Sequence, residues 1–238
     1  PQPAQGDDVY LDGHSTQVWI ASASGGSFEK VDFTKYGTAT VTVNDTIDTT
    51  TVDLSASTVL EGPSANYVFT ATLSNVSHGD TVITTDQGAI TIHDGQTKGT
   101  LTLPSGNGED VYLDGSQLTA TITGATGGNF ENLAIGTASA TAHVNDTLDP
   151  TTVNLGASTV LEGGIANYVF TATLSNVSHG DTVITTDQGV ITITDGQTTG
   201  TLTIASGNGE DVYLDASQLT ATITNATGGN FENLVVGT

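Results

Sequence analysis

Residues 65–88 read ANYVFTATLSNVSHGDTVITTDQG, and this stretch decides the fold. In its first half Tyr67, Phe69, Ala71 and Leu73 alternate with Val68 and threonines. A period of two with threonine on one face is typical of a half-buried β-strand, because β-branched side chains fit a pleated surface. The stretch therefore predicts strands. No part of the sequence has a convincing helical period.

The identical stretch recurs at residues 166–189, which is 101 positions further along the chain. The motif DVYLD recurs at a similar interval, at residues 8–12, 110–114 and 211–215. A repeating unit of about 100 residues is the size of a domain, whereas solenoid repeats are much shorter. The sequence therefore predicts a tandem array of domains.

Two related linkers, NDTID at 44–48 and NDTLD at 145–149, set the phase of the repeats. We expect residues 1–48 to be the C-terminal part of one repeat and residues 49–149 to be a complete repeat. Residues 150–238 then form a repeat that lacks its last strand. On this reading the chain is a window onto a longer array.

The complete repeat is expected to hold about seven short strands separated by turn signals such as Asp94-Gly95. Seven strands in a domain of this size indicate an immunoglobulin-like β-sandwich. The predicted fold class is therefore all-β, with tandem immunoglobulin-like sandwiches joined by short calcium-binding linkers. The expected strands are 51–58, 66–74, 80–85, 89–93, 98–103, 117–123 and 137–144.

The composition is strongly acidic, with 26 Asp and Glu against 3 Lys and Arg and a formal net charge of −23. Three lysines cannot form a basic patch, so nucleic acid and anionic membranes are poor partners. There is no cysteine, which excludes disulfides and thiolate metal sites. No apolar run is long enough for a membrane helix, and the first residues do not resemble a signal peptide, so we expect no membrane insertion.

The acids lie in loops and linkers, while the strands are almost uncharged. Alternate loops of a sandwich gather at opposite poles, so the loops around Glu61, Asp86 and residues 105–116 should share one pole with the linker 145–149. The loops around His78 and Asp94 should lie at the other pole. The acids expected at the first pole are Glu61, Glu109, Asp110, Asp114, Asp146 and Asp149.

Carboxylates that converge without basic partners form a hard-oxygen site, which suits Ca²⁺ better than zinc or copper. Asn145 would add an amide oxygen. The alternative is that these acids only solvate their loops, as a lone loop aspartate usually does. Their convergence at one pole favours calcium.

A resemblance to a known family rests on the combination of several motifs: TVLEG at 58–62 followed by Tyr67, IHDGQT at 92–97, EDVYLD at 109–114 and GGNFEN at 127–132. Together they resemble the extender repeats of giant RTX adhesins of the LapA type, bacterial proteins that are exported by type I secretion. The chain is also distantly similar to Calx-β domains. The resemblance implies a calcium-dependent, extracellular structural role at the bacterial cell surface, in biofilm formation or surface attachment.

The similarity to Calx-β domains also implies a calcium ligand set for each repeat. In the complete repeat the implied ligands are Glu61, Glu109, Asp110, the Tyr112 carbonyl, Asp114 and Asp146, with Asn145 and Asp149 beside them. In the third repeat the matching residues are Glu162, Glu210, Asp211 and Asp215, but the closing linker is missing. In the first repeat they are Asp7, Asp8, Asp12, Asn44, Asp45 and Asp48, without a Glu-Gly motif.

The expected function is therefore a spacer in a cell-surface adhesin, whose partners are the neighbouring repeats of the same chain. A calcium ion between the acidic pole and the linker would lock the angle between repeats. Asp149, with Asp195 or Glu232 of the next repeat, is a weaker candidate for a second junction ion. Near-identical tandem domains exchange strands readily, and the open edge of the third repeat could accept a strand such as 38–44 from another copy.

Two other classes of function are disfavoured. A calcium-dependent carbohydrate-binding module would need exposed aromatic residues, and Trp19 is the only tryptophan, more readily explained as a core or edge residue. An enzyme would need a catalytic constellation. The five histidines are scattered and no Gly-x-Ser-x-Gly elbow is present, so we expect no enzyme.

Overall fold

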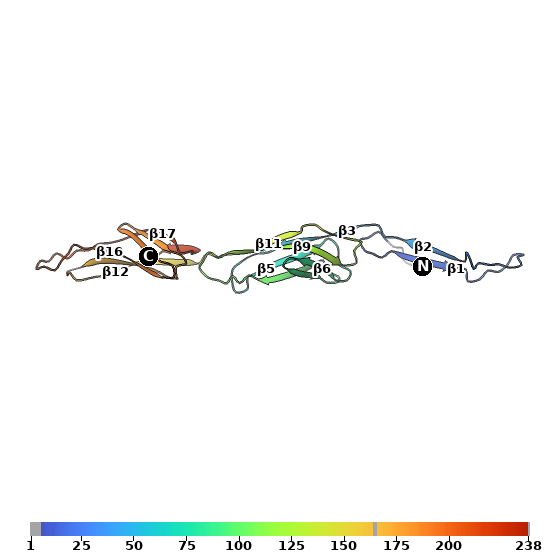
Figure 1. Ribbon diagram of the computed structural model, residues 1–238, viewed down its shortest axis with the longest axis horizontal. Helices are drawn as coiled ribbons and strands as arrows, with labels where there is room; N and C mark the ends of the chain where they lie inside the picture. The colour runs from blue at the N-terminus through green and yellow to red at the C-terminus, as the bar shows by residue number, and fades with distance from the viewer. Residues whose placement is uncertain (1–5, 164–165, 238) are drawn as a thin grey trace. The chain divides into compact units, whose positions relative to one another are not determined.

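The computed structural model describes residues 6–163 and 166–237, and all regular secondary structure in these residues is β (Figure 1). The strands form several sheets that pack as β-sandwiches. The expected all-β fold class is therefore confirmed. Within the described part of the chain there is no helix that could cross a membrane.

The chain divides into two compact units. The first contains the N-terminal segment as far as Ser57, together with Tyr67–Leu103 and Leu118–Ala142. The second contains Thr58–Asn66, Pro104–Gln117 and the C-terminal segment from His143. The acidic loops of the middle repeat therefore belong to the same unit as the third repeat. The division of the sequence into three repeats remains a prediction.

The N-terminal part of the first unit is a two-stranded antiparallel hairpin of β1 (His14–Trp19) and β2 (Thr38–Val43). Both strands are largely exposed on both faces. Trp19 lies at the end of β1 with 70% of its surface exposed, so it is at a sheet edge and not in a core.

The middle repeat is built from two sheets. The first sheet has the order β10 (Asn132–Ile135), β3 (Thr49–Ala56), β5 (Asn66–Leu73) and β8 (Lys98–Pro104). The second has the order β4 (Thr58–Leu60), β11 (Ser139–Asn145), β9 (Ser116–Gly127), β6 (Thr81–Thr85) and β7 (Gly88–Ile92). Most pairs are antiparallel, but β4 runs parallel to β11 and β10 runs parallel to β3.

The alternation seen in the sequence does set which face of each strand is buried. In β5 the residues Tyr67, Phe69, Ala71 and Leu73 are buried, and the threonines between them are only partly covered. Facing strands contribute further fully buried residues such as Ile83 and Ile90. The period-two prediction for this stretch is therefore confirmed.

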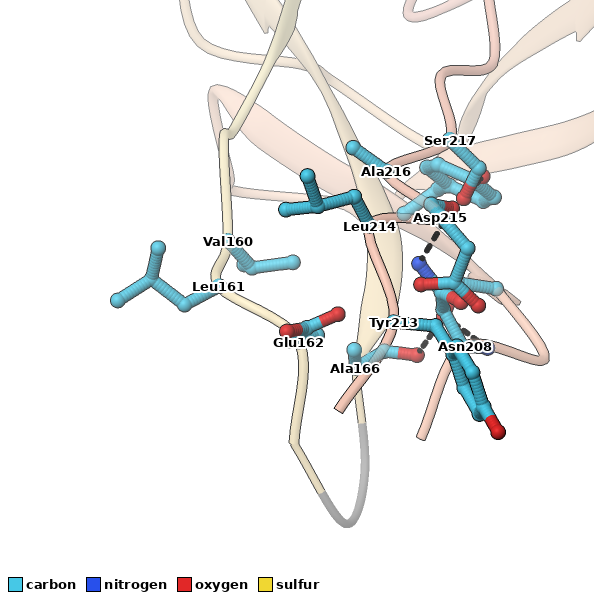
Figure 2. Close-up of a pocket in the computed structure, with 12 residues that line it drawn as sticks. Val160, Leu161, Glu162, Ala166, Asn208, Tyr213, Leu214, Asp215, Ala216 and Ser217 are labelled. Atoms are coloured by element: carbon cyan, nitrogen blue, oxygen red, sulfur yellow. Dashed lines mark hydrogen bonds between the residues drawn. The ribbon is translucent and has the colours of Figure 1, made fainter. Parts of the chain in front are cut away.

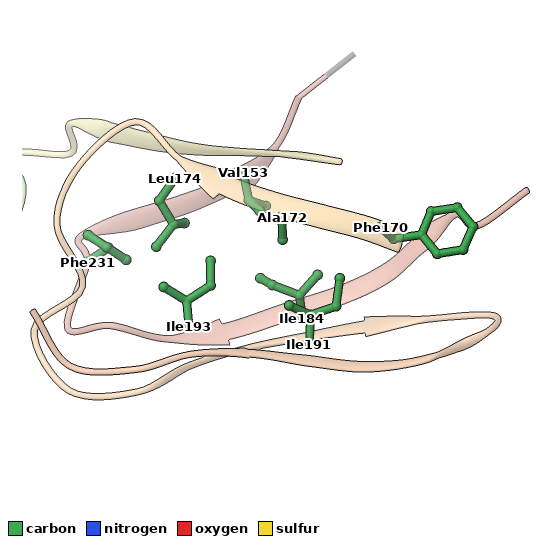
Figure 3. Packing of buried hydrophobic residues seen from close by; sticks show 8 residues of the cluster. All are labelled: Val153, Phe170, Ala172, Leu174, Ile184, Ile191, Ile193 and Phe231. Atoms are coloured by element: carbon green, nitrogen blue, oxygen red, sulfur yellow. The ribbon is translucent and has the colours of Figure 1, made fainter. Parts of the chain in front are cut away.

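The third repeat has the same two-sheet plan with fewer strands. One sheet has the order β16 (Thr199–Ala205), β13 (Asn167–Leu174), β12 (Pro150–Ala157) and β18 (Asn233–Val236). The other has the order β15 (Gly189–Ile193), β14 (Thr182–Thr186) and β17 (Ile223–Gly228). In Figure 3, Ile184, Ile191 and Ile193 face Val153, Ala172 and Leu174 across the core.

Two strands of the middle repeat, β4 and β10, were not expected from the sequence, and β9 continues to Gly127 rather than ending near residue 123. Three or four residues are too few to show an alternating pattern. Their pairing depends on partners far away in the sequence, such as Thr58 opposite His143. In the third repeat the segments equivalent to β4 and to the first half of β9 are not strands.

The buried core of the third repeat yields a stability prediction. Ile191→Ala removes a side chain with no exposed surface from β15 and should lower the free energy of unfolding by about 2–5 kcal/mol. Val190→Ala, at the neighbouring position with 54% exposure, should have a much smaller effect. Calorimetry of the two variants measures this, and equal shifts in unfolding temperature would contradict the assigned strand faces.

Candidate metal centre

The loop DVYLD is held in shape by its own side chains. Asp110 accepts a hydrogen bond from the backbone N–H of Tyr112 at 2.8 Å, which forms an Asx-turn. Buried Asn107 donates from its amide to the carbonyl oxygen of Asp114 at 3.2 Å. Asp114 in turn donates its N–H to Asp146 at 3.2 Å. These bonds fix the loop against the linker.

The parallel pairing of β4 with β11 delivers Glu61 to the same place. The N–H of Glu61 donates to the carbonyl of Asn145 at 2.9 Å, directly after the last paired residues. The carboxylate of Glu61 then accepts the N–H of Thr147 at 3.0 Å. Glu61 is only 5% exposed, so the sheet carries a carboxylate into the interior.

The hydroxyl of Thr147 lies within hydrogen-bonding distance of three carboxylates. It is 3.2 Å from Glu61, 2.8 Å from Glu109 and 3.0 Å from Asp149. A hydroxyl has a single proton to donate. The hydroxyl can therefore satisfy only one of these three carboxylates at a time, although the same oxygen of Glu61 also accepts the N–H of Thr147.

Glu232, which follows Phe231 before β18, completes the cluster. One carboxylate oxygen accepts the N–H of Asp149 at 2.6 Å. The other oxygen of Glu232 and one oxygen of Glu61 are buried, and among the described residues they have no hydrogen-bond partner. Buried polar atoms nearly always have a partner, so these two oxygens need another explanation, such as a cation or a bound proton.

Two groups of three acids place carboxylate oxygens within 4.8 Å of one another. The first is Glu61, Asp110 and Glu232, and the second is Glu61, Asp114 and Asp146. Glu61 belongs to both groups. An arrangement of this kind, with oxygen ligands alone and no regular geometry, can hold a hard divalent cation.

The clustered charges also change the acidity of the carboxyls. Burial, together with the Glu61 and Asp149 carboxyls, raises the pKa of Glu232 to about 7. Burial followed by Asp110, Glu61 and Asp146 raises the pKa of Asp114. The Thr147 hydroxyl lowers the pKa of Glu109, but contact with Asp149, burial and the nearby charges outweigh it, so that its pKa is raised. Without a cation, Glu232, Asp114 and Glu109 therefore keep their protons to a higher pH than ordinary carboxyls do.

A related arrangement lies in the first compact unit. A pocket of about 160 Å³ is lined by the acids of the DVYLD loop and the linker, with Glu131 beside them. Glu131 accepts the N–H of Asp48 at 2.6 Å, as Glu232 accepts that of Asp149. The expected ligands of the first repeat on this pocket are Asp7, Asp8, Asp12, Asn44 and Asp45.

The equivalent place in the third repeat is open. Figure 2 shows Glu162 on one segment and Asp215 on another, around a pocket of about 450 Å³. Glu162 is exposed, whereas its counterpart Glu61 is buried. Burial and the charges of Asp215, Glu210 and Asp211 raise the pKa of Glu162. Two of the acids expected for this repeat, Glu162 and Asp215, thus line the opening.

The structure brings together the six acids expected at the acidic pole, while Asn145 contributes a backbone carbonyl to the β4 connection and its side chain is exposed. Glu232 was expected only as a weaker candidate for a second junction ion beside Asp149, but it lies in the same acid group as Glu61 and Asp110. Asp195, the other suggested partner of Asp149, instead accepts a hydrogen bond from the N–H of Gly180 at 2.7 Å. The one signal for Glu232 in the sequence was its recurrence, because Glu131 occupies the same position one repeat earlier.

Comparison with known proteins gives one result. Three consecutive segments, residues 1–46, 48–147 and 149–238, each match the family model of the LapA domain. No curated protein matches the chain.

The raised pKa of Glu232 yields a prediction for the metal-free protein. The folded state holds a proton on Glu232 up to about pH 7, whereas the unfolded chain releases it near the ordinary value of 4.5. The folded state therefore binds more protons in this window, and the contribution of Glu232 to stability is lost as the pH rises through it.

In excess chelator, the unfolding temperature should accordingly fall between about pH 5 and about pH 8. Glu232→Gln, which cannot ionise, should make that fall smaller. Glu29→Gln, at an exposed acid outside the cluster, should leave it unchanged. Thermal melts followed by circular dichroism measure this, and a Glu232→Gln profile identical to that of the unsubstituted chain would contradict the assignment.

Proposed function

The chain belongs to the LapA domain family, and on that premise we propose that it is a spacer region of a large bacterial adhesin at the cell surface, in which Ca²⁺ joins consecutive repeats. The spacer holds a ligand-binding region away from the cell for surface attachment or biofilm formation. It has no catalytic role of its own.

The observation that carries this proposal is the pair of Glu61, which is buried, and Glu232, which is half-buried. Each has one buried oxygen without a hydrogen-bond partner among the described residues. Glu61 comes from the middle repeat and Glu232 from the next one. Bringing two charged carboxylates out of water costs several kcal/mol unless something compensates them. A divalent cation bound to both would compensate them and tie the two repeats together.

The donor set favours calcium among the common cations. All the candidate ligands are oxygen atoms, and they come from loops, a linker and a strand end rather than from a regular scaffold. Ca²⁺ accepts about six to eight oxygens in irregular geometry, while Mg²⁺ requires a near-ideal octahedron and zinc prefers nitrogen and sulfur. Extracellular calcium modules have dissociation constants of roughly 10⁻⁴ to 10⁻³ M.

The linker explains how an ion would stiffen the array. Asp146, Thr147 and Asp149 all contact the cluster, through Asp114, Glu61 and Glu232 respectively. A linker that is bonded along its length has few backbone conformations left. An ion that neutralises the cluster would strengthen these contacts, and without it carboxylate repulsion opposes them.

Calcium would also couple folding to location. Where calcium is scarce, the carboxylates repel one another and the repeats are less stable, which suits export by type I secretion. Outside the cell an ion that binds only the folded state stabilises it by mass action, by about 2.7 kcal/mol at 100 times the dissociation constant. The fold would thus become stiff only where the spacer works.

Calcium titration with a matched pair of variants tests the proposal. Calcium should raise the unfolding temperature, magnesium at the same concentration should have a much smaller effect, and calorimetric titration should find more than one site. Glu61→Gln should lose most of the stabilisation and weaken binding by at least about tenfold, the equivalent of 1.4 kcal/mol.

The control is Glu162→Gln, the same substitution within an identical TVLEG motif, at a position that is exposed. It should retain most of the calcium effect. An unchanged unfolding temperature in calcium, or equal losses in the two variants, would contradict the proposal.

A further inference from the structure

The compact units contain a second recurring contact that needs no metal. In the second unit the ring of Tyr112 stacks on His179, with ring centres 3.8 Å apart and planes inclined by 14°. It also lies 5.7 Å from the ring of Phe231. Tyr112 precedes the linker, while His179 and Phe231 follow it, so the stack connects residues of two consecutive repeats.

The first unit contains the same arrangement. Tyr10 stacks on His78 at 3.7 Å and 13°, and lies 5.7 Å from Phe130. Its hydroxyl donates to the carbonyl of Val76 at 2.7 Å, as the Tyr112 hydroxyl donates to Val177 at 2.8 Å. Each tyrosine ring is therefore held on its face by aromatic contact and at its tip by a hydrogen bond.

A specialised turn receives the tyrosine loop. Gly228, Gly229 and Asn230 all have positive φ, at 94°, 76° and 55°, a region that side chains other than glycine and asparagine rarely adopt. The turn presents the carbonyl of Asn230 to the N–H of Leu113 at 2.9 Å, and its side-chain amide donates to the Leu113 carbonyl at 3.2 Å. The equivalent turn at Asn129 binds Leu11 in the same way.

The stack and the acidic cluster share a backbone. Tyr112 is two residues from Asp110, and Phe231 is adjacent to Glu232. The N–H of Glu232 also donates to the carbonyl of Val111 at 3.0 Å, and Val111 lies between Asp110 and Tyr112 in the sequence. Docking of the Tyr112 ring therefore constrains the distance between the carboxylates of Asp110 and Glu232.

The third repeat shows the same loop without a receiving turn. The N–H of Tyr213 donates to Asp211 at 2.7 Å, so the Asx-turn is already formed. Yet Tyr213 is 71% exposed and the flanking Leu214 is fully exposed. Tyr213 lines the open pocket of Figure 2 together with Leu214. The loop thus has its shape before it docks, and docking adds the ring contacts.

We propose that the tyrosine of each DVYLD loop is a plug that docks in a socket formed by the histidine and phenylalanine of the next repeat, and that this docking orders the junction before calcium binds. The proposal deepens the spacer function and rests on it for its biological meaning. The Tyr112 side chain acts in positioning: its ring does not bind the ion but sets the spacing of Asp110 and Glu232, independently of the expected role of the Tyr112 carbonyl as a ligand. The socket offers an aromatic face, which any aromatic ring can contact, and a carbonyl acceptor, which adds one hydrogen bond for the tyrosine hydroxyl.

A distance measurement within the second unit tests the proposal. The chain has no cysteine, so Pro104→Cys and Thr201→Cys, both at exposed positions, allow two spin labels to be attached uniquely. Pulsed electron paramagnetic resonance then gives the distribution of distances between the middle repeat and the third. The variants are Tyr112→Ala, Tyr112→Phe and, as the matched control, Tyr213→Ala in the undocked loop.

In excess chelator, the distribution should be clearly broader for Tyr112→Ala than for the parent, while Tyr213→Ala should match the parent and Tyr112→Phe should lie close to it. On addition of calcium, Tyr112→Ala should require about three- to tenfold more calcium for half of the narrowing, the amount expected for one aromatic contact. The Tyr112→Phe variant is the control for a general loss of stability. If the ring contact sets the calcium midpoint, this variant should have the midpoint of the parent, whereas Tyr112→Ala should not.

The proposal would be overturned if the distance distributions of Tyr112→Ala and Tyr213→Ala were equally wide in chelator. It would also be overturned if Tyr112→Ala had the same calcium midpoint as the parent. The chelator experiment does not depend on metal binding. If calcium has no effect on any variant, the calcium joint fails, and the widths in chelator still decide the plug separately.

Discussion

The structure depends on the burial of Glu61 beside Glu232. A carboxylate that is 5% exposed, with one oxygen that has no partner in the described part of the chain, is costly to place in a protein interior. The chain nevertheless holds it there with ordinary means: a short parallel strand and hydrogen bonds from the backbone N–H and the hydroxyl of Thr147. The loop, the linker and the next repeat are all positioned by bonds to this group of acids. Neutralising part of this charge, by protons or by a cation, would remove repulsion that opposes the arrangement.

The same local sequence has different environments in the two later repeats. The motif TVLEG occurs at 58–62 and at 159–163, but Glu61 is buried in a dense network and Glu162 is exposed beside an open pocket. Tyr112 and Tyr213 differ in the same way. The local turn is formed in both copies, whereas the burial of Glu61 and Tyr112 comes from β11, the linker and residues of the following repeat. Each junction is therefore a property of two repeats together.

Much of the fold could be predicted from the sequence because the core strands are locally patterned. The alternation of Tyr67, Phe69, Ala71 and Leu73 is visible in β5 itself, and the acids of the loops could be assigned to one pole from connectivity alone. The short strands β4 and β10 could not be predicted, because their partners lie about 85 residues away, as with Thr58 and His143.

The contact of Glu232 with Glu61 and the aromatic plug could not be derived for a related reason, although the sequence did offer Glu232 as a weaker candidate beside Asp149. Their roles arise from contacts across a linker, and the sequence contains no local pattern for such a contact. The similarity to Calx-β domains implies a role only for the Tyr112 carbonyl, whereas in the structure the Tyr112 ring stacks on His179 and its hydroxyl donates to Val177. Recurrence of Tyr, His and Phe in successive repeats was a signal, but identical repeats also copy residues without function.

The most direct test of the calcium joint is a crystal structure of the chain grown in calcium. The account predicts an ion between the middle and third repeats, bound by oxygens of Glu61, Asp110 and Glu232 at about 2.3–2.6 Å. Anomalous scattering at a long wavelength would identify it. Crystals from saturating calcium in which Glu61 and Glu232 face each other with only water or a shared proton between them would contradict the account.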